Sequence, residues 1–413
     1  MTTATPDNTA DRAIRVIHYW GGCPQTANSK WQRFLHLSRG CADAGWRTHL
    51  VWSRMPEDPQ LSTPFRDAGC EIILQPRPPR NIDPACVWRT YRLLRRLRCD
   101  VIHCHNVHTS PLLGAALAGV PVRIWSKLAM SPYYERSISP RGIHRYQPSV
   151  RLSAAMAHRV LCISSAVRDE LVSLGVSPAK LNVVPAPVDL ERCTTVQANG
   201  LRTELGVTDD ELVISTVGHA VPVKGWDLLL RAYASVAHDA PASRLWLVGS
   251  TTGTEEREMT RQLRELAETL GVSQHVQWLG QRPDIPSILQ ATDVFTFPSR
   301  SDGQGLALTE AIAAGLPCIA SRAGGIPELI DHDANGLLFN REDVDGLARA
   351  LQTLLGDSQL RSRLGQAARH SAQRFGLDRA TQQMLGLYRE LLDKQSAAAG
   401  GVAHATTEWA DRP

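Results

Sequence analysis

The fold is decided by residues 293–329, DVFTFPSRSDGQGLALTEAIAAGLPCIASRAGGIPEL. The apolar start, Val294 to Phe297, predicts a buried strand, and the polar, glycine-rich stretch after it predicts a turn. A helical pattern from Leu306 to Ala314 follows, and Gly315 with Pro317 ends it. This order is typical of a parallel α/β sheet, whose ligands bind beyond the carboxyl ends of the strands.

Two acidic residues in this segment are candidate ligand-binding groups, Asp302 in the turn and Glu310 in the helix. The loop and the helix start offer unpaired backbone N–H groups and the positive end of the helix dipole, which suit a phosphate. Glu310 lies one turn into the helix, where it can accept hydrogen bonds from sugar hydroxyls. A phosphate together with hydroxyl groups indicates a nucleotide or a nucleotide sugar.

The rest of the chain predicts two domains, because 413 residues are too many for one ordinary core. Strand and helix patterns alternate from Arg15 to Ala118 and again from Leu212 to Phe297, which indicates two parallel sheets. Prolines and polar residues between Val183 and Gly200 predict a linker, with the boundary near Asp189. We therefore expect an α/β chain with a first domain at 13–189, a second at 190–375, a helix at 376–395 packing back on the first domain, and flexible tails at 1–12 and 396–413.

Charge and composition limit the partners. Residues 1–190 contain 24 basic and 13 acidic side chains, a net charge of +11, and the remainder has a net charge of −7, so the first half prefers anions. No apolar run is long enough to cross a bilayer, and the first residues lack a secretory signal pattern, which predicts a cytoplasmic protein. Nine cysteines without CxxC spacing favour reduced thiols over a disulfide framework or a zinc ribbon.

A second glycine loop opens the second domain. Gly218, Lys224 and Gly225 follow the predicted strand 212–217, where a pyrophosphate would bind. Lys224 would supply positive charge, and the glycines would let the backbone approach the phosphates closely. The alternative is an exposed surface lysine.

Four ordered segments resemble the retaining glycosyltransferases of family 4, which have the GT-B fold of two Rossmann-like domains facing an interdomain cleft. The resemblance covers nearly the whole chain. It implies transfer of a sugar from a UDP- or GDP-sugar to a saccharide or lipid-linked acceptor with retention, in polysaccharide, lipopolysaccharide or glycolipid synthesis, without a metal or cofactor. The segments are HRVLCISSAVRDELVSLGVSPAKLNVVPAPVDL from His158, GHAVPVKGWDLLLRAY from Gly218, WLGQRPDIPSILQATDVFTFPS from Trp278 and SDGQGLALTEAIAAGLPCIASRAGGIPELI from Ser301.

The resemblance also implies residue roles. The family's two glutamates with seven residues between them map onto Asp302 and Glu310, so Asp302 would face the donor sugar and Glu310 the ribose. We expect Asp302, Glu310 and Lys224 to be the catalytic residues. Gly303 to Gly305 would line the donor phosphate with backbone N–H groups, and Arg282 would lie near the base. The expected donor-binding residues are Gly218, His219, Lys224, Arg282, Gly303, Gln304, Gly305, Leu306 and Glu310.

The sequence departs from the family pattern in three places. Asp302 is one methylene shorter than the usual glutamate and would reach the sugar from a shifted loop or through water. His219 replaces an arginine, which removes one permanent charge from the phosphate site. A first-domain histidine is missing, with Ser126 to Leu128 in its place. Lys127 could serve there as a cation near the phosphates, or it could be a solvated lysine.

The acceptor side is expected in the first domain. Gly21 and Gly22 follow the first strand, where relatives place a glycine loop, although a tight turn explains them as well. In the sequence HCHNVH, His103 and His105 would share one face of a strand and His108 would lie in a loop. We expect His105 to lie on the acceptor side of the cleft, with ordinary packing as the alternative, and we expect no metal site.

A basic segment, VWRTYRLLRRLRCD, predicts a surface helix whose leucines cover the first sheet and whose arginines face water. The alternative is peripheral docking of this helix on an anionic membrane surface. Nucleic acid is not an expected partner, because no binding module is present and the second half is acidic. The functional alternatives to a transferase are a nucleotide-sugar epimerase or glycoside phosphorylase of the same fold, and a degenerate relative that binds nucleotide sugar without turnover.

Overall fold

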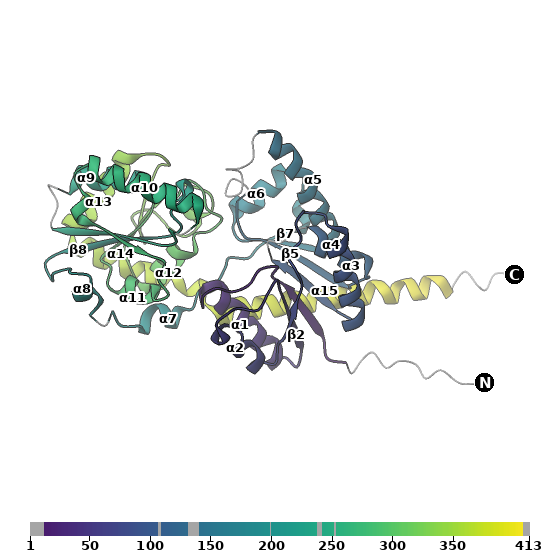
Figure 1. The fold of residues 1–413 in the computed structure, drawn as a ribbon. Helices are drawn as coiled ribbons and strands as arrows, with labels where there is room; N and C mark the ends of the chain where they lie inside the picture. The colour runs from purple at the N-terminus through teal and green to yellow at the C-terminus, as the bar shows by residue number, and fades with distance from the viewer. Residues whose placement is uncertain are drawn as a thin grey trace.

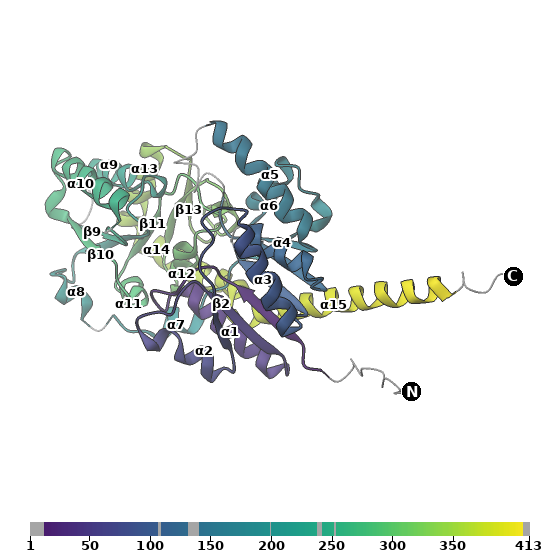
Figure 2. The same cartoon turned by 45° about the vertical axis from the view of Figure 1, so that its right-hand side comes forward.

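The protein consists of two α/β domains that lie side by side, with the last helix running along the first domain and past it (Figure 1). Turning the molecule by 45° leaves the same arrangement, with the two sheets on opposite sides of the interdomain region (Figure 2). The computed structural model describes residues 12–105, 109–130, 140–198, 200–237, 242–251 and 253–407. His108 lies outside these residues.

The first domain is built on a seven-stranded sheet with the order β3-β2-β1-β4-β5-β6-β7, and its neighbouring strands pair in parallel. Its strands are β1 (Arg15–Tyr19), β2 (Arg47–Trp52), β3 (Glu71–Leu74), β4 (Val101–His105), β5 (Val122–Lys127), β6 (Arg159–Cys162) and β7 (Leu181–Val183). Its helices are α1 (Ser29–Asp43), α2 (Thr63–Asp67), α3 (Pro84–Leu97), α4 (Thr109–Leu117), α5 (Pro140–Met156) and α6 (Ser165–Ser173).

The second domain repeats this plan with a six-stranded parallel sheet in the order β10-β9-β8-β11-β12-β13. Its strands are β8 (Leu212–Val217), β9 (Ser243–Val248), β10 (Val276–Gly280), β11 (Val294–Phe297), β12 (Cys318–Ser321) and β13 (Leu337–Phe339). Its helices are α7 (Leu190–Thr195), α8 (Leu201–Glu204), α9 (Trp226–Val236), α10 (Thr254–Thr269), α11 (Ile285–Gln290), α12 (Leu306–Ala314), α13 (Val344–Gly356) and α14 (Ser358–Ser371).

Two doubly wound sheets confirm the predicted α/β class. In both sheets the order reverses beside the first strand of the domain, β1 or β8, which is the switch point where such sheets bind ligands. The central strands read as continuous apolar runs because helices cover both of their faces. In the second domain β11 is buried throughout, as its sequence VFTF predicts.

The last helix, α15 (Leu377–Thr407), packs on the first domain. Leu385, Tyr388 and Leu391 are buried against a cluster that includes Val16 and Trp46. The helix continues past residue 395, where we had predicted the start of a flexible tail at 396–413. Its alanine-rich continuation cannot build a core, but alanine is the strongest helix former, so the backbone stays helical to Thr407.

The linker after β7 is held by both domains. The buried Gln304 side chain of the second domain accepts a hydrogen bond from the Ala186 N–H at 2.6 Å and donates one to the Ala186 carbonyl at 3.1 Å. A backbone bridge joins Val188 to Gly376, just before α15. The Glu328 carboxylate accepts the first two N–H groups of α6 at 2.9 and 3.1 Å, which satisfies donors that a helix start leaves unpaired.

Candidate active site

The donor side of the candidate site is formed by two loops at the carboxyl ends of adjacent strands. The loop after β8 ends in a short turn that contains Lys224, and the loop after β11 contains Asp302. Because β8 and β11 pair directly in the sheet, the two loops meet. Lys224 Nζ donates a hydrogen bond to Asp302 Oδ2 at 2.6 Å and lies 5.1 Å from the centre of the Phe297 ring.

Asp302 is therefore a paired carboxylate rather than an exposed one. Its side chain is 18% exposed, and its second oxygen accepts the Gln304 N–H at 3.2 Å. The exposed alternative considered for Lys224 does not hold, since its side chain is only 12% exposed. A lysine ammonium has three donors, so Lys224 can bind Asp302 and still donate to a phosphate oxygen.

Arg300 holds these two loops together, and the sequence reasoning missed it. Its backbone N–H donates to the Val223 carbonyl at 2.7 Å, and its guanidinium donates to the Pro222 carbonyl at 2.6 Å. The same guanidinium makes a two-pronged ion pair with Asp227 at 2.7 and 2.8 Å. An arginine before an aspartate in a glycine turn carries no signal by itself, because Pro222, Val223 and Asp227 all lie more than 70 residues away in the sequence.

Glu310 lies on α12 and faces the first domain. Its carboxylate accepts a hydrogen bond from the Ser29 hydroxyl at the start of α1. Burial raises the pKa of Glu310, and the Ser29 hydrogen bond and the positive charge of Arg192 oppose that rise. Arg192 also donates to the Ala27 carbonyl at 2.9 Å, so both residues connect the second domain to the segment before α1.

The other predicted donor residues occupy different positions around this centre. A side-chain carbon placed on Gly218 would lie 3.4 Å from the Lys224 side chain, an ordinary contact, so Gly218 packs beside the lysine. Gly303 lies against the first domain, where such a carbon would be 3.1 Å from the Leu128 carbonyl. Gly305 immediately precedes α12, and Leu306, its first residue, packs against the first-domain core. The side chain of Gln304 is turned to the linker instead of the donor loops.

Arg282 and His219 each contact a carboxylate other than Asp302. Arg282 makes two hydrogen bonds to the Asp284 carboxylate at 2.7 and 2.8 Å. The His219 side chain is 56% exposed, and its ring nitrogen is 3.6 Å from a carboxylate oxygen of Glu256. His219 therefore faces a carboxylate in the position where the family pattern has an arginine.

Gly21, Gly22, His105 and Lys127 all follow or end first-domain strands. Gly21 and Gly22 turn the chain after β1, and their backbone bonds to β2 and to Ser53. Lys127, at the end of β5, is 1% exposed, so the solvated alternative was wrong. It is buried because β5 is an interior strand of the sheet, between β4 and β6.

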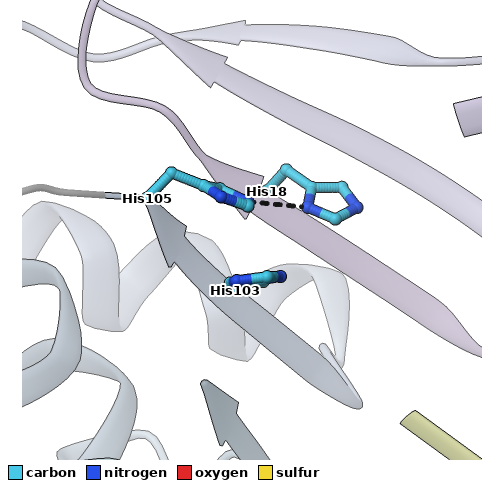
Figure 3. A group of neighbouring side chains, drawn as sticks. All are labelled: His18, His103 and His105. Carbon is cyan, nitrogen blue, oxygen red and sulfur yellow. Dashed lines mark hydrogen bonds between the residues drawn. The ribbon is translucent and has the colours of Figure 1, made fainter. Parts of the chain in front are cut away.

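His105 belongs to a buried group with His18 and His103, which Figure 3 shows on β1 and β4, with His105 at the tip of β4. His18 Nδ1 and His105 Nε2 are 3.1 Å apart, and one of them donates to the other. Both nitrogens of His103 are engaged, one with the Tyr388 hydroxyl at 2.6 Å and one with the Ser126 hydroxyl at 2.7 Å. The predicted common face of His103 and His105 is confirmed by their ring centres, 3.8 Å apart.

Charge around the three histidines argues against a bound metal cation. Burial, and to a smaller degree the positive charge of Arg33, lowers the pKa of His18 to about 3. Burial, then the neighbouring histidines and then Arg33, hold the pKa values of His103 and His105 well below the ordinary range. Neutral histidines could ligate a metal, but Arg33 would repel it and His103 would have to give up a hydrogen bond. Among the residues that the structure describes, this is the one group of three with ligand atoms close enough to hold an ion.

Comparisons with known proteins match both domains of the chain. The models for Glycosyltransferase Family 4 and for Glycosyl transferases group 1 match residues 32–192 and 199–371. A D-inositol 3-phosphate glycosyltransferase of Saccharomonospora viridis is 34% identical over 244 residues, 58% of this chain and 57% of the relative. A UDP-Gal:alpha-D-GlcNAc-diphosphoundecaprenol alpha-1,3-galactosyltransferase of Escherichia coli is 28% identical over 310 residues, 72% of this chain and 78% of the relative.

The fold comparison covers both domains together. The structure of Anabaena HepE in complex with UDP and glucose superimposes with a TM-score of 0.75 at 20% identity, covering 91% of this chain and all of that one. The chain spans about three fifths of the length of the inositol-phosphate relatives it matches. One family model matches each domain, and the paired sheets match a known two-domain transferase fold. The chain therefore belongs to glycosyltransferase family 4, the group 1 glycosyltransferases, and has the GT-B fold.

Proposed function

We propose that this protein transfers a sugar from a nucleotide-sugar donor to an acceptor, with retention at the anomeric carbon. The observation that carries the proposal is the Lys224–Asp302 pair at the carboxyl ends of β8 and β11, followed on α12 by Glu310, which contacts the first domain. These groups supply a cation for phosphates and two carboxylates for hydroxyl groups. They lie beside the switch point of the second sheet, where ligands of such sheets bind.

In this proposal Glu310 holds the ribose of the donor. The Ser29 hydroxyl already donates to its carboxylate, so a ribose hydroxyl would take over the same hydrogen bond. Lys224 would neutralise the phosphates while keeping Asp302 in place, and Asp302 would orient the sugar. Lys224 thereby stabilises the charge that develops on the leaving phosphate, which is where such catalysis acts.

The acceptor proton would pass to the leaving phosphate on the same face of the sugar. This route needs no protein base, which fits a chain with Ser126, Lys127 and Leu128 where relatives have a histidine. It also needs no divalent metal or other cofactor, because Lys224 supplies the positive charge. We expect turnover with EDTA to equal turnover with magnesium. A strict requirement for a divalent cation would contradict this part of the proposal.

UDP-sugars are the first donors to test, since the E. coli relative is named for UDP-Gal and HepE was solved with UDP. We would measure thermal stabilisation by UDP, GDP and ADP and then nucleotide release from their sugars. Glu310→Gln should lose most of the release, whereas Glu268→Gln, an exposed carboxylate on α10, should keep it. Absence of both stabilisation and release with every nucleotide would favour the degenerate, non-catalytic alternative. An epimerised nucleotide sugar as the product would favour the epimerase.

We further propose a lipid-linked or saccharide acceptor and docking of the protein on the cytoplasmic face of an anionic membrane. A groove beside α3 is lined by Arg89, Arg92, Arg95 and Arg96, and Leu74 and Trp88 nearby are 51% and 59% exposed. Cationic and exposed apolar groups together suit an anionic lipid surface. In the described part of the chain, no helix has the length and apolar character to span a bilayer.

The docking proposal is tested with vesicles. We expect the protein to sediment with vesicles containing phosphatidylglycerol and the Arg92→Glu, Arg95→Glu double variant to stay in solution. Arg341→Glu, a charge reversal at an exposed site of the second domain, is the control. Equal binding of all three proteins would contradict docking through α3.

A further inference from the structure

The first domain carries two cations that the donor site does not use. Lys30 and Arg33 lie one turn apart on α1, so their side chains share a face of the helix. Both are partly buried, and no carboxylate of the described residues lies within ion-pair distance of either. Positive groups removed from water without a counter-ion are costly, so an unpaired pair indicates a place for an anion.

Aromatic side chains surround the two cations. Lys30 Nζ lies 4.6 Å from the centre of the Trp20 ring, and Arg33 Cζ lies 5.3 Å from the centre of the Phe34 ring. These two rings stack at 4.5 Å, and His105 meets Phe34 edge-on at 4.5 Å. The two cations therefore lie against aromatic rings, and one of these rings contacts His105 of the histidine group in Figure 3.

Arg33 faces a small cavity that contains hydrogen-bonding groups. The cavity has a volume of about 40 Å³, and its polar lining includes Arg33, His103, His105 and Ser126. Burial and the neighbouring arginine lower the pKa of Lys30 to about 7, and burial lowers the pKa of Arg33 to about 10. Arg33 thus stays positive at neutral pH, and a bound anion would restore the full charge of Lys30.

The neutral histidine pair supplies one further donor. His18 and His105 each carry one N–H, and the contact of 3.1 Å between them uses only one of the two. The remaining N–H is on His105 Nδ1 or on His18 Nε2, depending on the tautomers. His18 Nε2 is buried and has no hydrogen-bond partner in the described part of the chain. Of the two histidines, His105 lines the cavity together with Arg33.

We propose that Lys30, Arg33 and the His18–His105 pair form a binding site for a phosphate monoester carried by the acceptor. Two cations match a dianion, and the guanidinium fork fits two phosphate oxygens at once. The site starts one residue from Ser29, the residue that contacts Glu310, so an acceptor held there would lie beside the donor. This assignment to the acceptor rests on the proposed transferase function, whereas the oxyanion site itself does not.

The test measures inorganic phosphate binding in the Lys224→Met background, where the donor loop has lost its cation. Phosphate should raise the melting temperature at constant ionic strength, and acetate, with one charge, should do so less. Arg33→Gln and Lys30→Met should each weaken phosphate binding by about tenfold or more. Arg39→Gln, an exposed arginine on the same helix, is the matched control and should bind as the parent does.

Several results would overturn the site. They are absence of stabilisation by phosphate, equal binding by the Arg33→Gln and Arg39→Gln proteins, or acetate binding as tightly as phosphate. If Arg33→Gln does not fold, as judged by circular dichroism, the Lys30→Met result decides. A second arm compares glycerol with glycerol 3-phosphate, and only the phosphorylated compound should bind.

A further measurement distinguishes phosphate groups of the nucleotide, bound at Lys224, from phosphate bound at Arg33. With Lys224 intact, UDP should bind the Arg33→Gln protein as it binds the wild type, because the donor phosphates belong to Lys224. An equal loss of UDP and phosphate affinity would overturn the acceptor assignment. Phosphate binding without any nucleotide binding would refute the transferase proposal and leave the oxyanion site standing, so the two failures are distinguishable.

Discussion

Replacement of Gly225 by alanine should separate the two donor loops. Gly225 follows Lys224, immediately precedes α9 and has a φ of 66°, a region that residues with a side chain rarely adopt. A Cβ at this position would lie 2.0 Å from the Pro298 carbonyl oxygen, and Cβ contacts below 3.0 Å essentially do not occur. The Lys224 loop and the segment leading to Asp302 must therefore move apart by about 1 Å.

The expected loss of unfolding free energy in Gly225→Ala has two parts. The left-handed backbone costs about 1–2 kcal/mol for alanine, and the forced displacement adds about 1–3 kcal/mol to the loss of unfolding free energy. A displacement of about 1 Å near reacting groups costs about 100-fold in turnover. The movement also stretches the hydrogen bonds from Arg300 to Val223 and Pro222, which now tie the loops together.

Gly271→Ala is the matched control. Gly271 has a φ of 72°, but a Cβ there would meet nothing within 4 Å, so it should show only the backbone cost and keep its turnover. The assay is urea unfolding of both variants together with nucleotide release at saturating donor. If Gly225→Ala loses no more stability and no more turnover than Gly271→Ala, the close packing of the two loops does not support the site as we describe it.

Three further changes test single contacts. Lys224→Met should reduce steady-state turnover by about 10²- to 10³-fold, because it removes the cation that faces the leaving phosphate, and turnover within a factor of two of wild type would contradict that role. Burial raises the pKa of Glu310, so the folded state holds this proton more tightly than the unfolded chain and stability is lost as pH rises through the folded pKa. Glu310→Gln should therefore melt above the wild type at pH 7 and match it near about pH 4, by differential scanning fluorimetry, and a lower melting temperature at pH 7 would refute the sign. Tyr388→Phe leaves His103 Nδ1 without its partner at 2.6 Å and should cost about 1–3 kcal/mol in urea unfolding, whereas an unchanged unfolding midpoint would show that this bond contributes little.

The fold was readable from the sequence because its signals are local. The strand β11 and the helix α12 begin and end within one residue of their predicted positions, since an apolar run, a glycine turn and a terminal glycine act within a few residues. The length of α15 was not readable in the same way. Its alanine-rich end predicts a tail because it cannot form a core, but helix formation depends on backbone propensity as well as burial.

The contacts of the site that the sequence did not predict have a different cause. Ser29 meets Glu310 across 281 residues of chain, and His18 meets His105 across 87. These contacts depend on which strands become neighbours and on how the two domains approach, and a serine or a histidine in a strand pattern predicts neither. Lys127 was misjudged for the same reason, because its burial follows from β4 and β6 lying on either side of β5.

Asp302 shows how a departure from a family pattern can be compensated in three dimensions. Its shortness suggested a carboxylate that must reach the sugar from a shifted loop, yet the structure pairs it with Lys224 at 2.6 Å and with the Gln304 N–H at 3.2 Å. A longer glutamate in the same loop would have to fold back to keep the lysine contact, which costs side-chain entropy. The aspartate therefore suits a site in which the first acidic residue also fixes the position of Lys224, the lysine that we propose to bind phosphate. Since His219 lies 3.6 Å from Glu256 and its side chain is half exposed, the proposed site would depend on Lys224 for the charge that an additional arginine would share.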